Sequence, residues 1–212
     1  MKAQSQIIST LLIVIIAIVL VSSTYLWGVP IIQQRQDAAV AERVAEDFNP
    51  ENSNSLVKRM QYVSNFGGDE LYTVSTSGSW LLHPFDEASQ DANSLEFSFL
   101  SKNTNFNDFS SVGWINKTAG VDCNSLPLMQ GTLGTDTSYA VCVKSETSGS
   151  ISRITYKIIF RDLMDPTSSK LYRLNLVGQP PTFSSTSKSI RITKGQTPIG
   201  LPVITELKVL FP

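Results

Sequence analysis

Residues 2–30 read KAQSQIISTLLIVIIAIVLVSSTYLWGVP, and Lys2 is the only charged side chain among them. The apolar part of this stretch, Ile7 to Trp27, is roughly 21 residues long, which at ~1.5 Å per helical residue matches the ~30 Å hydrocarbon core of a bilayer. A helix satisfies its own backbone hydrogen bonds, so it is the structure that such a segment adopts in lipid. Residues 28–30, Gly-Val-Pro, are expected to end or kink this helix near the headgroups.

The charges that flank the apolar segment predict its orientation. Lys2 and the amino terminus are positive on one side, whereas Arg35 and Asp37 cancel on the other. The positive-inside rule therefore places the amino terminus in the cytoplasm and the rest of the chain outside. The predicted localisation is the cell membrane, with a single pass and an extracellular C-terminal domain.

Three interpretations of the apolar segment remain open at this point. Val21-Ser22-Ser23 has the small-residue pattern of a secretory cleavage site before Thr24, which would make the segment an export signal. An uncleaved segment would be a permanent anchor. A third possibility is a helix that packs against copies of itself.

The residues after Pro30 bear on this choice. The stretch IIQQRQDAAVAERVAEDF, residues 31–48, contains strong helix formers and is followed by the stop signal Asn49-Pro50. One face of the predicted helix carries Val40, Ala41, Val44, Ala45 and Phe48. Small residues on this stripe let a neighbouring helix approach closely, as in a helical bundle or filament core. The alternative is that the stripe packs on the globular domain of the same chain.

The amino-terminal residues resemble the class III signal peptides of archaeal type IV pilin-like proteins, including archaellins and their accessory subunits. The matching residues are Lys2-Ala3 as the end of a short leader, Gln4 as the first mature residue and Ile7 to Trp27 as the apolar helix. The resemblance implies that a prepilin peptidase cuts between Ala3 and Gln4 and that the helix stays on the mature protein. Two positions differ from the common pattern, because Ala3 stands in place of Gly and Ile8 in place of an acidic residue.

The remainder of the chain predicts a β-rich domain. Apolar and polar residues alternate in Leu95–Phe99 and in Ile154–Phe160, and stretches rich in Ser, Thr, Gly, Asn and Asp separate the candidate strands. This spacing favours an antiparallel, Ig-like β-sandwich. The Pro-containing stretch at 178–189 is expected to be a long hairpin loop or a crossing between sheets. Further candidate strands are Val57–Ser64, Leu71–Thr76, Ser79–Leu82, Val112–Ile115, Tyr139–Lys144, Leu171–Val177, Ile190–Thr193 and Thr205–Phe211.

The predicted domain organisation has three parts. Residues 1–3 are a possible leader, residues 4–48 a transmembrane helix with an amphipathic extension, and residues 49–212 an extracellular β-sandwich domain. The fold class is thus mainly β, with a long N-terminal helix.

Two cysteines and one sequon fit an extracellular domain. A bond between Cys123 and Cys142 would close a loop of about 20 residues and stabilise the fold by roughly 3 kcal/mol. The alternative is a pair of buried thiols. Asn116 begins the glycosylation sequon Asn-Lys-Thr in a predicted surface loop.

The sequence contains no recognisable catalytic motif. His83 is the only histidine, so a hydrolase triad would have to use it, and its place between a strand and a turn favours a structural role. The adjacent carboxylates Asp69-Glu70 and Asp86-Glu87 are typical of solvated turns. No metal-ligand spacing is present, and we expect no cofactor, no metal and no enzymatic activity.

Charge and composition restrict the partners. The formal net charge is −1, and Lys and Arg do not cluster, so nucleic acid is not an expected partner. The expected function is that of a pilin-like structural or adhesive subunit, whose partners are the membrane, further copies or related pilin-like subunits, and a prepilin peptidase. The alternative is a membrane-anchored binding module for a cell-envelope or carbohydrate partner.

Overall fold

The apolar N-terminal segment is part of one long helix. α1 spans Lys2–Asp47 and continues through Pro30, so of the two predicted outcomes at residues 28–30 the end of the helix is excluded, and a kink there stays a prediction. It stops just before Asn49-Pro50, as predicted. The computed structural model describes residues 2–86, 92–102, 114–118, 122–124, 130–149, 151–180, 183–197, 200 and 202–212, with side chains from residue 8 onward.

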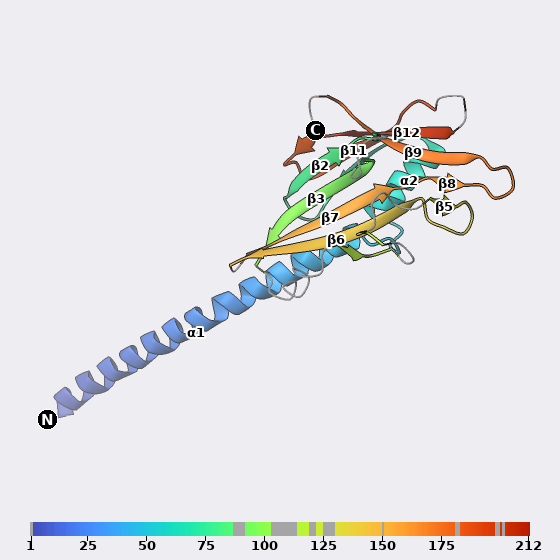
Figure 1. The fold of residues 1–212 in the computed structure, drawn as a ribbon. Helices are drawn as coiled ribbons and strands as arrows, with labels where there is room; N and C mark the ends of the chain where they lie inside the picture. The colour runs from blue at the N-terminus through green and yellow to red at the C-terminus, as the bar shows by residue number, and fades with distance from the viewer. Residues whose placement is uncertain are drawn as a thin grey trace. The chain divides into compact units, whose positions relative to one another are not determined.

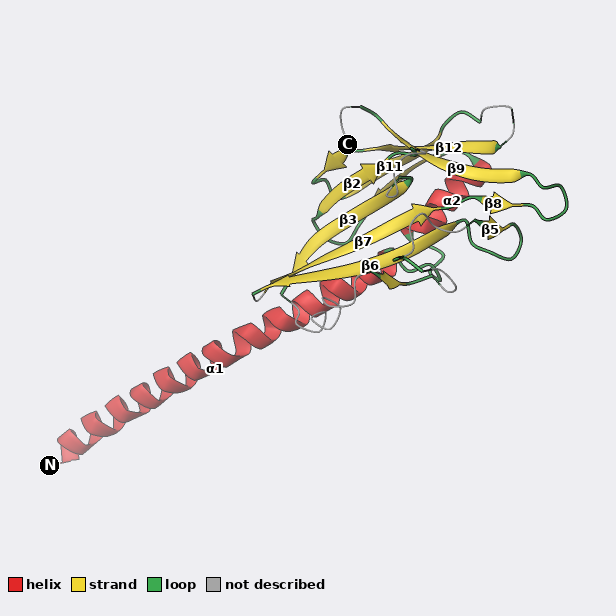
Figure 2. Ribbon diagram, in the orientation of Figure 1, coloured by secondary structure: helices red, strands yellow, loops and turns green. Residues whose placement is uncertain are grey.

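The chain divides into two compact units, Met1–Ala39 and Val40–Pro212, which we call the N-terminal unit and the globular unit. The globular unit begins before the predicted domain boundary at residue 49, because the last turns of α1 belong to it. Figure 2 shows its two kinds of element, with strands in yellow and helices in red.

A second helix, α2, spans Leu56–Phe66. The predicted strand at Val57–Ser64 is therefore wrong. The buried residues of this segment recur at helical spacing, with Met60 and Val63 following Leu56 by about one and two turns. Gly67, with φ of 80°, ends the helix in the left-handed region that glycine favours.

Within the described residues, twelve strands form two six-stranded sheets (Figure 1). Sheet A has the order β1-β11-β12-β9-β8-β5, and sheet B the order β10-β2-β3-β7-β6-β4. The strands are β1 Asp69–Thr73, β2 Ser79–His83, β3 Ser94–Ser101, β4 Ile115–Asn116, β5 Gly131–Thr132, β6 Tyr139–Ser148, β7 Ile151–Phe160, β8 Leu163–Met164, β9 Leu171–Gly178, β10 Ser184–Ser185, β11 Ser189–Lys194 and β12 Val203–Leu210.

The two-sheet prediction is confirmed, and the antiparallel prediction holds only in part. The strand pairs of sheet B are antiparallel, whereas in sheet A β9 runs parallel to β12 and β5 runs parallel to β8. The chain leaves sheet A after β9, adds β10 to sheet B and returns as β11, so the Pro-containing stretch is a crossing between sheets. The Ig-like relationship stays a prediction. The predicted strand at Val112–Ile115 lies mostly outside the described residues.

One hydrophobic core joins both sheets and the helices of the globular unit. Alternate residues of β3 and β7 face it, as the period of two in the sequence predicted. α2 packs against β1, β11 and β12 of sheet A. The fully buried side chains include Ala41, Val44, Phe48, Leu56, Met60, Leu95, Phe97, Ile154, Ile158, Leu176, Ile190, Ile192, Leu207 and Val209.

Candidate functional site

The apolar part of α1 is exposed along its whole length in the described part of the chain. From Ile8 to Trp27 every residue is exposed, and the large apolar side chains range from 49% exposed at Ile16 to 75% at Trp27. Such a continuous apolar surface is unfavourable in water and needs lipid or another helix to cover it. Among the described residues, α1 is the one helix that is long and apolar enough to cross a membrane.

A polar side chain within this segment is satisfied locally. Thr24 Oγ1 donates a hydrogen bond of 2.8 Å to the carbonyl of Leu20, one turn earlier. This bond removes an unpaired hydroxyl group from the helix surface, as a lipid environment requires. The predicted secretory cleavage site before Thr24 lies within the continuous helix α1.

The predicted processing residues also lie at the start of α1. Ala3 and Gln4 are helical, and their side chains are outside the described part of the chain. Cleavage between them stays a prediction.

The amphipathic stripe packs inside the chain's own globular unit. Ala41, Val44 and Phe48 are 0% exposed, and Val40 and Ala45 are partly buried. The expectation that this stripe packs a neighbouring helix is therefore corrected, because its most apolar members are already covered. The alternative weighed from the sequence, packing on the same chain, is the one observed.

Phe48 is the centre of this contact. Its ring centroid lies 4.8 Å from that of Tyr156, 5.8 Å from that of Phe97 and 6.2 Å from that of Trp80, all on sheet B. Aromatic pairs at these separations add to the stabilisation that burial supplies. The C-terminal end of α1 is thus fixed to the sheet that it approaches.

Asp47 attaches the same helix end to β1 and the residues after it. The hydroxyl of Tyr72 donates to the carbonyl and to Oδ1 of Asp47, at 3.2 and 3.3 Å, and the amide of Ser75 donates to Oδ2 at 3.0 Å. Burial, together with the charge of Asp47, raises the pKa of Tyr72. The phenol therefore remains a hydrogen-bond donor throughout the physiological pH range.

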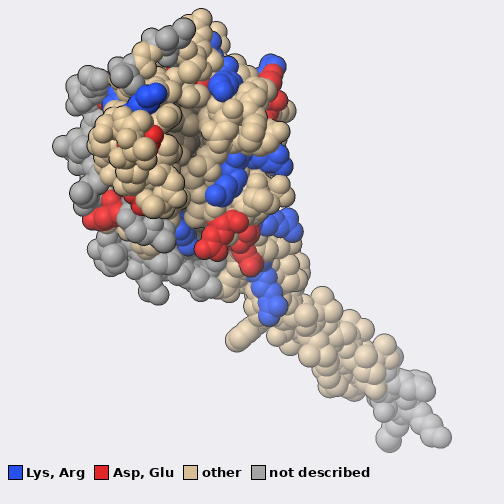
Figure 3. Space-filling view, turned by 90° about the vertical axis from the view of Figure 1, so that its right-hand side faces the viewer, with Lys and Arg blue, Asp and Glu red and all other residues tan. Residues whose placement is uncertain are grey.

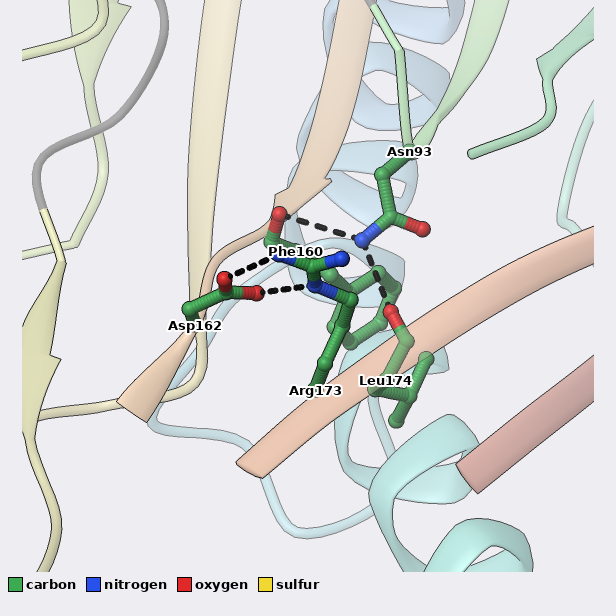
Figure 4. Close-up of polar contacts among 5 residues, drawn as sticks. All are labelled: Asn93, Phe160, Asp162, Arg173 and Leu174. Atoms are coloured by element: carbon green, nitrogen blue, oxygen red, sulfur yellow. Dashed lines mark hydrogen bonds and ion pairs between the residues drawn. The ribbon is translucent and has the colours of Figure 1, made fainter. Parts of the chain in front are cut away.

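A buried polar cluster bridges the two sheets (Figure 4). The side-chain amide of Asn93 donates to the carbonyls of Phe160 on β7 and Leu174 on β9, at 3.3 and 2.7 Å, and its oxygen accepts from the amide of Leu176 at 2.8 Å. Asn93 is 5% exposed and has a φ of 63°. The sequence analysis missed this residue, although asparagine is among the few residues that adopt positive φ readily.

An ion pair lies beside this bridge. Nε and Nη2 of Arg173 donate to the two carboxylate oxygens of Asp162, at 2.8 and 2.6 Å, and the guanidinium lies 4.4 Å from the ring centroid of Phe85. The bidentate geometry fixes the start of β9 to the segment between β7 and β8. The sequence analysis missed this pair as well, since its members are brought together only by the sheet.

The predicted disulfide is present. Cys123 and Cys142 are bonded, with their Cα atoms 6.0 Å apart, and both are buried. Asn116 is exposed on β4, and its Oδ1 accepts a hydrogen bond of 2.8 Å from the amide of Cys123. Glycosylation of Asn116 stays a prediction.

His83 lies beside a carboxylate. Its Nε2 is 3.8 Å from Oε1 of Glu96, and the same carboxylate pairs with Lys157 at 3.1 Å. In the part of the chain that the structure describes, no three His, Cys, Asp or Glu side chains are grouped as a metal site would require. The absence of enzymatic activity stays a prediction.

A cavity of about 390 Å³ lies at the end of the globular unit, between α2 and sheet A. Lys58, Arg161 and Arg173 contribute cations to its lining, and Asp136 contributes a carboxylate. The face of the globular unit seen in Figure 3 carries Lys and Arg interspersed with Asp and Glu. The expectation that nucleic acid is not a partner stays a prediction.

Comparison of the chain with protein-family models, with curated proteins and with solved structures finds no match.

Proposed function

We propose that the chain is a membrane-anchored, pilin-like surface subunit. The observation that supports this proposal is the apolar surface of Ile8–Trp27, which is exposed among the residues that the structure describes. Lipid covers this surface in a single anchored chain, and neighbouring helices cover it in an assembly. One helix therefore serves membrane retention and lateral packing in succession.

In this proposal the amino terminus is cytoplasmic and the globular unit is outside the cell. Lys2 supports this orientation through the positive-inside rule. The Cys123–Cys142 disulfide supports it independently, because disulfides persist in oxidising compartments.

Lateral packing in this proposal uses the apolar segment rather than the amphipathic stripe. Ala41, Val44 and Phe48 are occupied in the core of the same chain. The surface that remains for neighbouring helices is that of residues 8–32, with the small side chain of Ala17 in its middle. Prepilin peptidase would expose Gln4 as the new amino terminus before such packing begins.

The test is the mass of the amino-terminal peptide of the protein from membranes, with and without a prepilin peptidase. A start at Gln4 that depends on the peptidase supports the pilin-like proposal. A start at Met1 or Lys2 would reduce the function to permanent anchoring, and a start at Thr24 would overturn both. Ala3→Phe should block the first cleavage, and Ser23→Phe is the matched control that should block only a cut before Thr24.

The second candidate function is a membrane-anchored binding module for a cell-envelope or carbohydrate partner. The cavities of the globular unit favour it, since ligand sites are concave and few per protein. Deletion of residues 1–39 separates the two functions, because it removes the exposed part of α1 and leaves the buried stripe at Ala41, Val44 and Phe48 in place. A binding module keeps its affinity after this truncation, whereas a filament subunit loses assembly.

A further inference from the structure

A groove of about 350 Å³ lies on sheet B. Cross-strand pairing places Ser79 of β2 opposite Ser98 of β3, Ser98 opposite Thr155 of β7, and Thr155 opposite Lys144 of β6. All four line the groove. The register of four strands therefore aligns three hydroxyl groups and an ammonium group in one row.

Two of the three hydroxyls of this row are within hydrogen-bonding distance of each other. Ser98 Oγ and Thr155 Oγ1 are 2.9 Å apart. Each hydroxyl has one donor and two acceptor positions, so both keep capacity for a ligand when they bond to each other. The floor is rigid, because it is built on strands rather than on loops.

The charges that line the groove balance. Lys144 and Arg153 face Glu96 and Glu146, with Nζ of Lys144 2.6 Å from Oε1 of Glu146. The hydrogen bond from Lys144 holds the pKa of Glu146 below its usual range, so this carboxylate stays ionised at neutral pH. Glu96 is also paired, with Lys157, which is 3% exposed. A ligand with a net charge gains little from such a site, whereas a neutral ligand with many hydroxyls finds both donors and acceptors.

One wall of the groove is the indole of Trp114. Nζ of Lys157 lies over this ring, 5.5 Å from its centroid. The amide of Trp114 donates to Oδ1 of Asn124 at 3.1 Å, and Nδ2 of Asn124 donates back to the carbonyl of Trp114 at 3.0 Å.

The disulfide fixes this wall to the floor. Asn124 directly follows Cys123, which is bonded to Cys142 on β6. Two hydrogen bonds and one covalent link therefore hold Trp114 beside the row of hydroxyls. A site whose groups are held in place before binding loses less entropy when a ligand enters.

We propose that this groove binds a neutral carbohydrate. A sugar ring places its C–H face against Trp114, and its hydroxyls exchange hydrogen bonds with the serine, threonine and carboxylate groups of the floor. This site rests on the second candidate function, the binding module, and names its ligand class, and it is independent of membrane anchoring and assembly.

The experiment measures sugar binding to the full chain by isothermal titration calorimetry in lauryldimethylamine oxide, a detergent without a sugar headgroup. The probes are maltotriose, cellotriose, mannotriose and chitotriose, with cationic chitosan trisaccharide and anionic trigalacturonate as charged comparators. We expect at least one neutral trisaccharide to bind and the charged ones to bind more weakly. No binding by any neutral probe, or binding confined to the charged ones, would overturn the proposal.

Two variants locate the site. Trp114→Ala should weaken binding by roughly tenfold or more, since it removes the apolar wall. Ser79→Ile changes an exposed strand position, retains the fold and should weaken binding several-fold by narrowing the groove and removing a hydroxyl. Ser79→Ile decides the question if Trp114→Ala does not fold.

Phe66→Ala is the matched control, because it removes an aromatic side chain that is 77% exposed on α2 and outside the groove. The affinity of this variant for the neutral trisaccharide should equal that of the unchanged chain. Equal affinity in Ser79→Ile and the unchanged chain would place the sugar elsewhere and overturn the proposal. Membrane extraction of the same preparation reports on the anchoring function separately.

Discussion

Two segments of helix α1, Ile8–Trp27 and Ala41–Asp47, differ in what surrounds their apolar side chains. In the first segment every residue is exposed, whereas in the second Ala41 and Val44 are completely buried. The first is apolar around its whole circumference, and the second is apolar on one face only. A helix of the first kind needs lipid or other helices to cover it. A helix of the second kind buries its apolar face against the domain of the same chain. The comparison shows that one continuous helix can depend on two different environments.

The largest effect should come from breaking the buried end. Phe48→Ala removes a fully buried ring that contacts three aromatic side chains, and we expect a loss of about 3–5 kcal/mol in the free energy of unfolding. Chemical denaturation of the full chain in micelles, followed by near-UV circular dichroism, measures it. Ile15→Ala, at a position 51% exposed, is the control and should leave this free energy unchanged. Equal effects of the two variants would contradict the comparison.

A charge in the exposed segment should reduce membrane insertion without changing the stability of the globular unit. Ile18→Arg should disfavour membrane insertion by about 3 kcal/mol, because the guanidinium would lie near the bilayer centre. The fraction that resists alkaline extraction from membranes measures insertion, and Ile18→Leu is the matched control. The unfolding midpoint of the globular unit should stay the same. A lowered midpoint would show that the two segments are energetically coupled.

The hydrogen bonds of Asn93 between the two sheets offer a sharper test of the buried part of the molecule. Asn93→Ala leaves two carbonyls and one amide without their side-chain partner and should cost about 2 kcal/mol of unfolding free energy. Part of that cost is backbone strain at a φ of 63°. Asn93→Gly separates the parts, because glycine adopts this φ freely and should recover about 1 kcal/mol. Equal stability of both variants would assign the whole cost to the lost hydrogen bonds.

The smallest effect concerns an exposed ion pair at the edge of sheet A. The hydrogen bond from Arg191 holds the pKa of Asp69 below its usual range. A carboxyl whose pKa is lowered by folding stabilises the fold above its unfolded pKa of about 3.9, and this contribution disappears as the pH falls through the lower folded value. Asp69→Asn should therefore lower the denaturant concentration at the midpoint of unfolding slightly at pH 7 and leave it unchanged at pH 2. A difference that persists at pH 2 would rule out the ion pair as its cause.

The fold could be predicted from the sequence where one local pattern decided the structure. The apolar length of Ile7–Trp27 predicted the helix, and the alternation in Leu95–Phe99 and Ile154–Phe160 predicted strands of sheet B. Val57–Ser64 was misassigned because short apolar segments fit both periods until their neighbours decide which face is buried. The parallel pairing of β9 with β12 could not be predicted, since it joins strands that are distant in the chain.

The candidate sites divide in the same way. The disulfide was predictable from two cysteines, whereas the row of hydroxyls beside Trp114 depends on the register of four strands. Residues at positions 79, 98 and 155 have no local signal in common, because each is an ordinary polar residue on the outer face of its own strand.

The sequence by itself determined that this chain has a charge-free helix long enough for a membrane and a β-rich domain with one possible disulfide. Hydrophobic length and periodicity are local properties, so the order of residues along the chain is enough to show them. Only the tertiary structure decided that the stripe at Ala41, Val44 and Phe48 is internal and that Asn93 bridges the sheets. The physical reason is that a side chain's partner is set by long-range packing, and an apolar face is equally suited to a neighbouring chain or to its own core until the fold covers it.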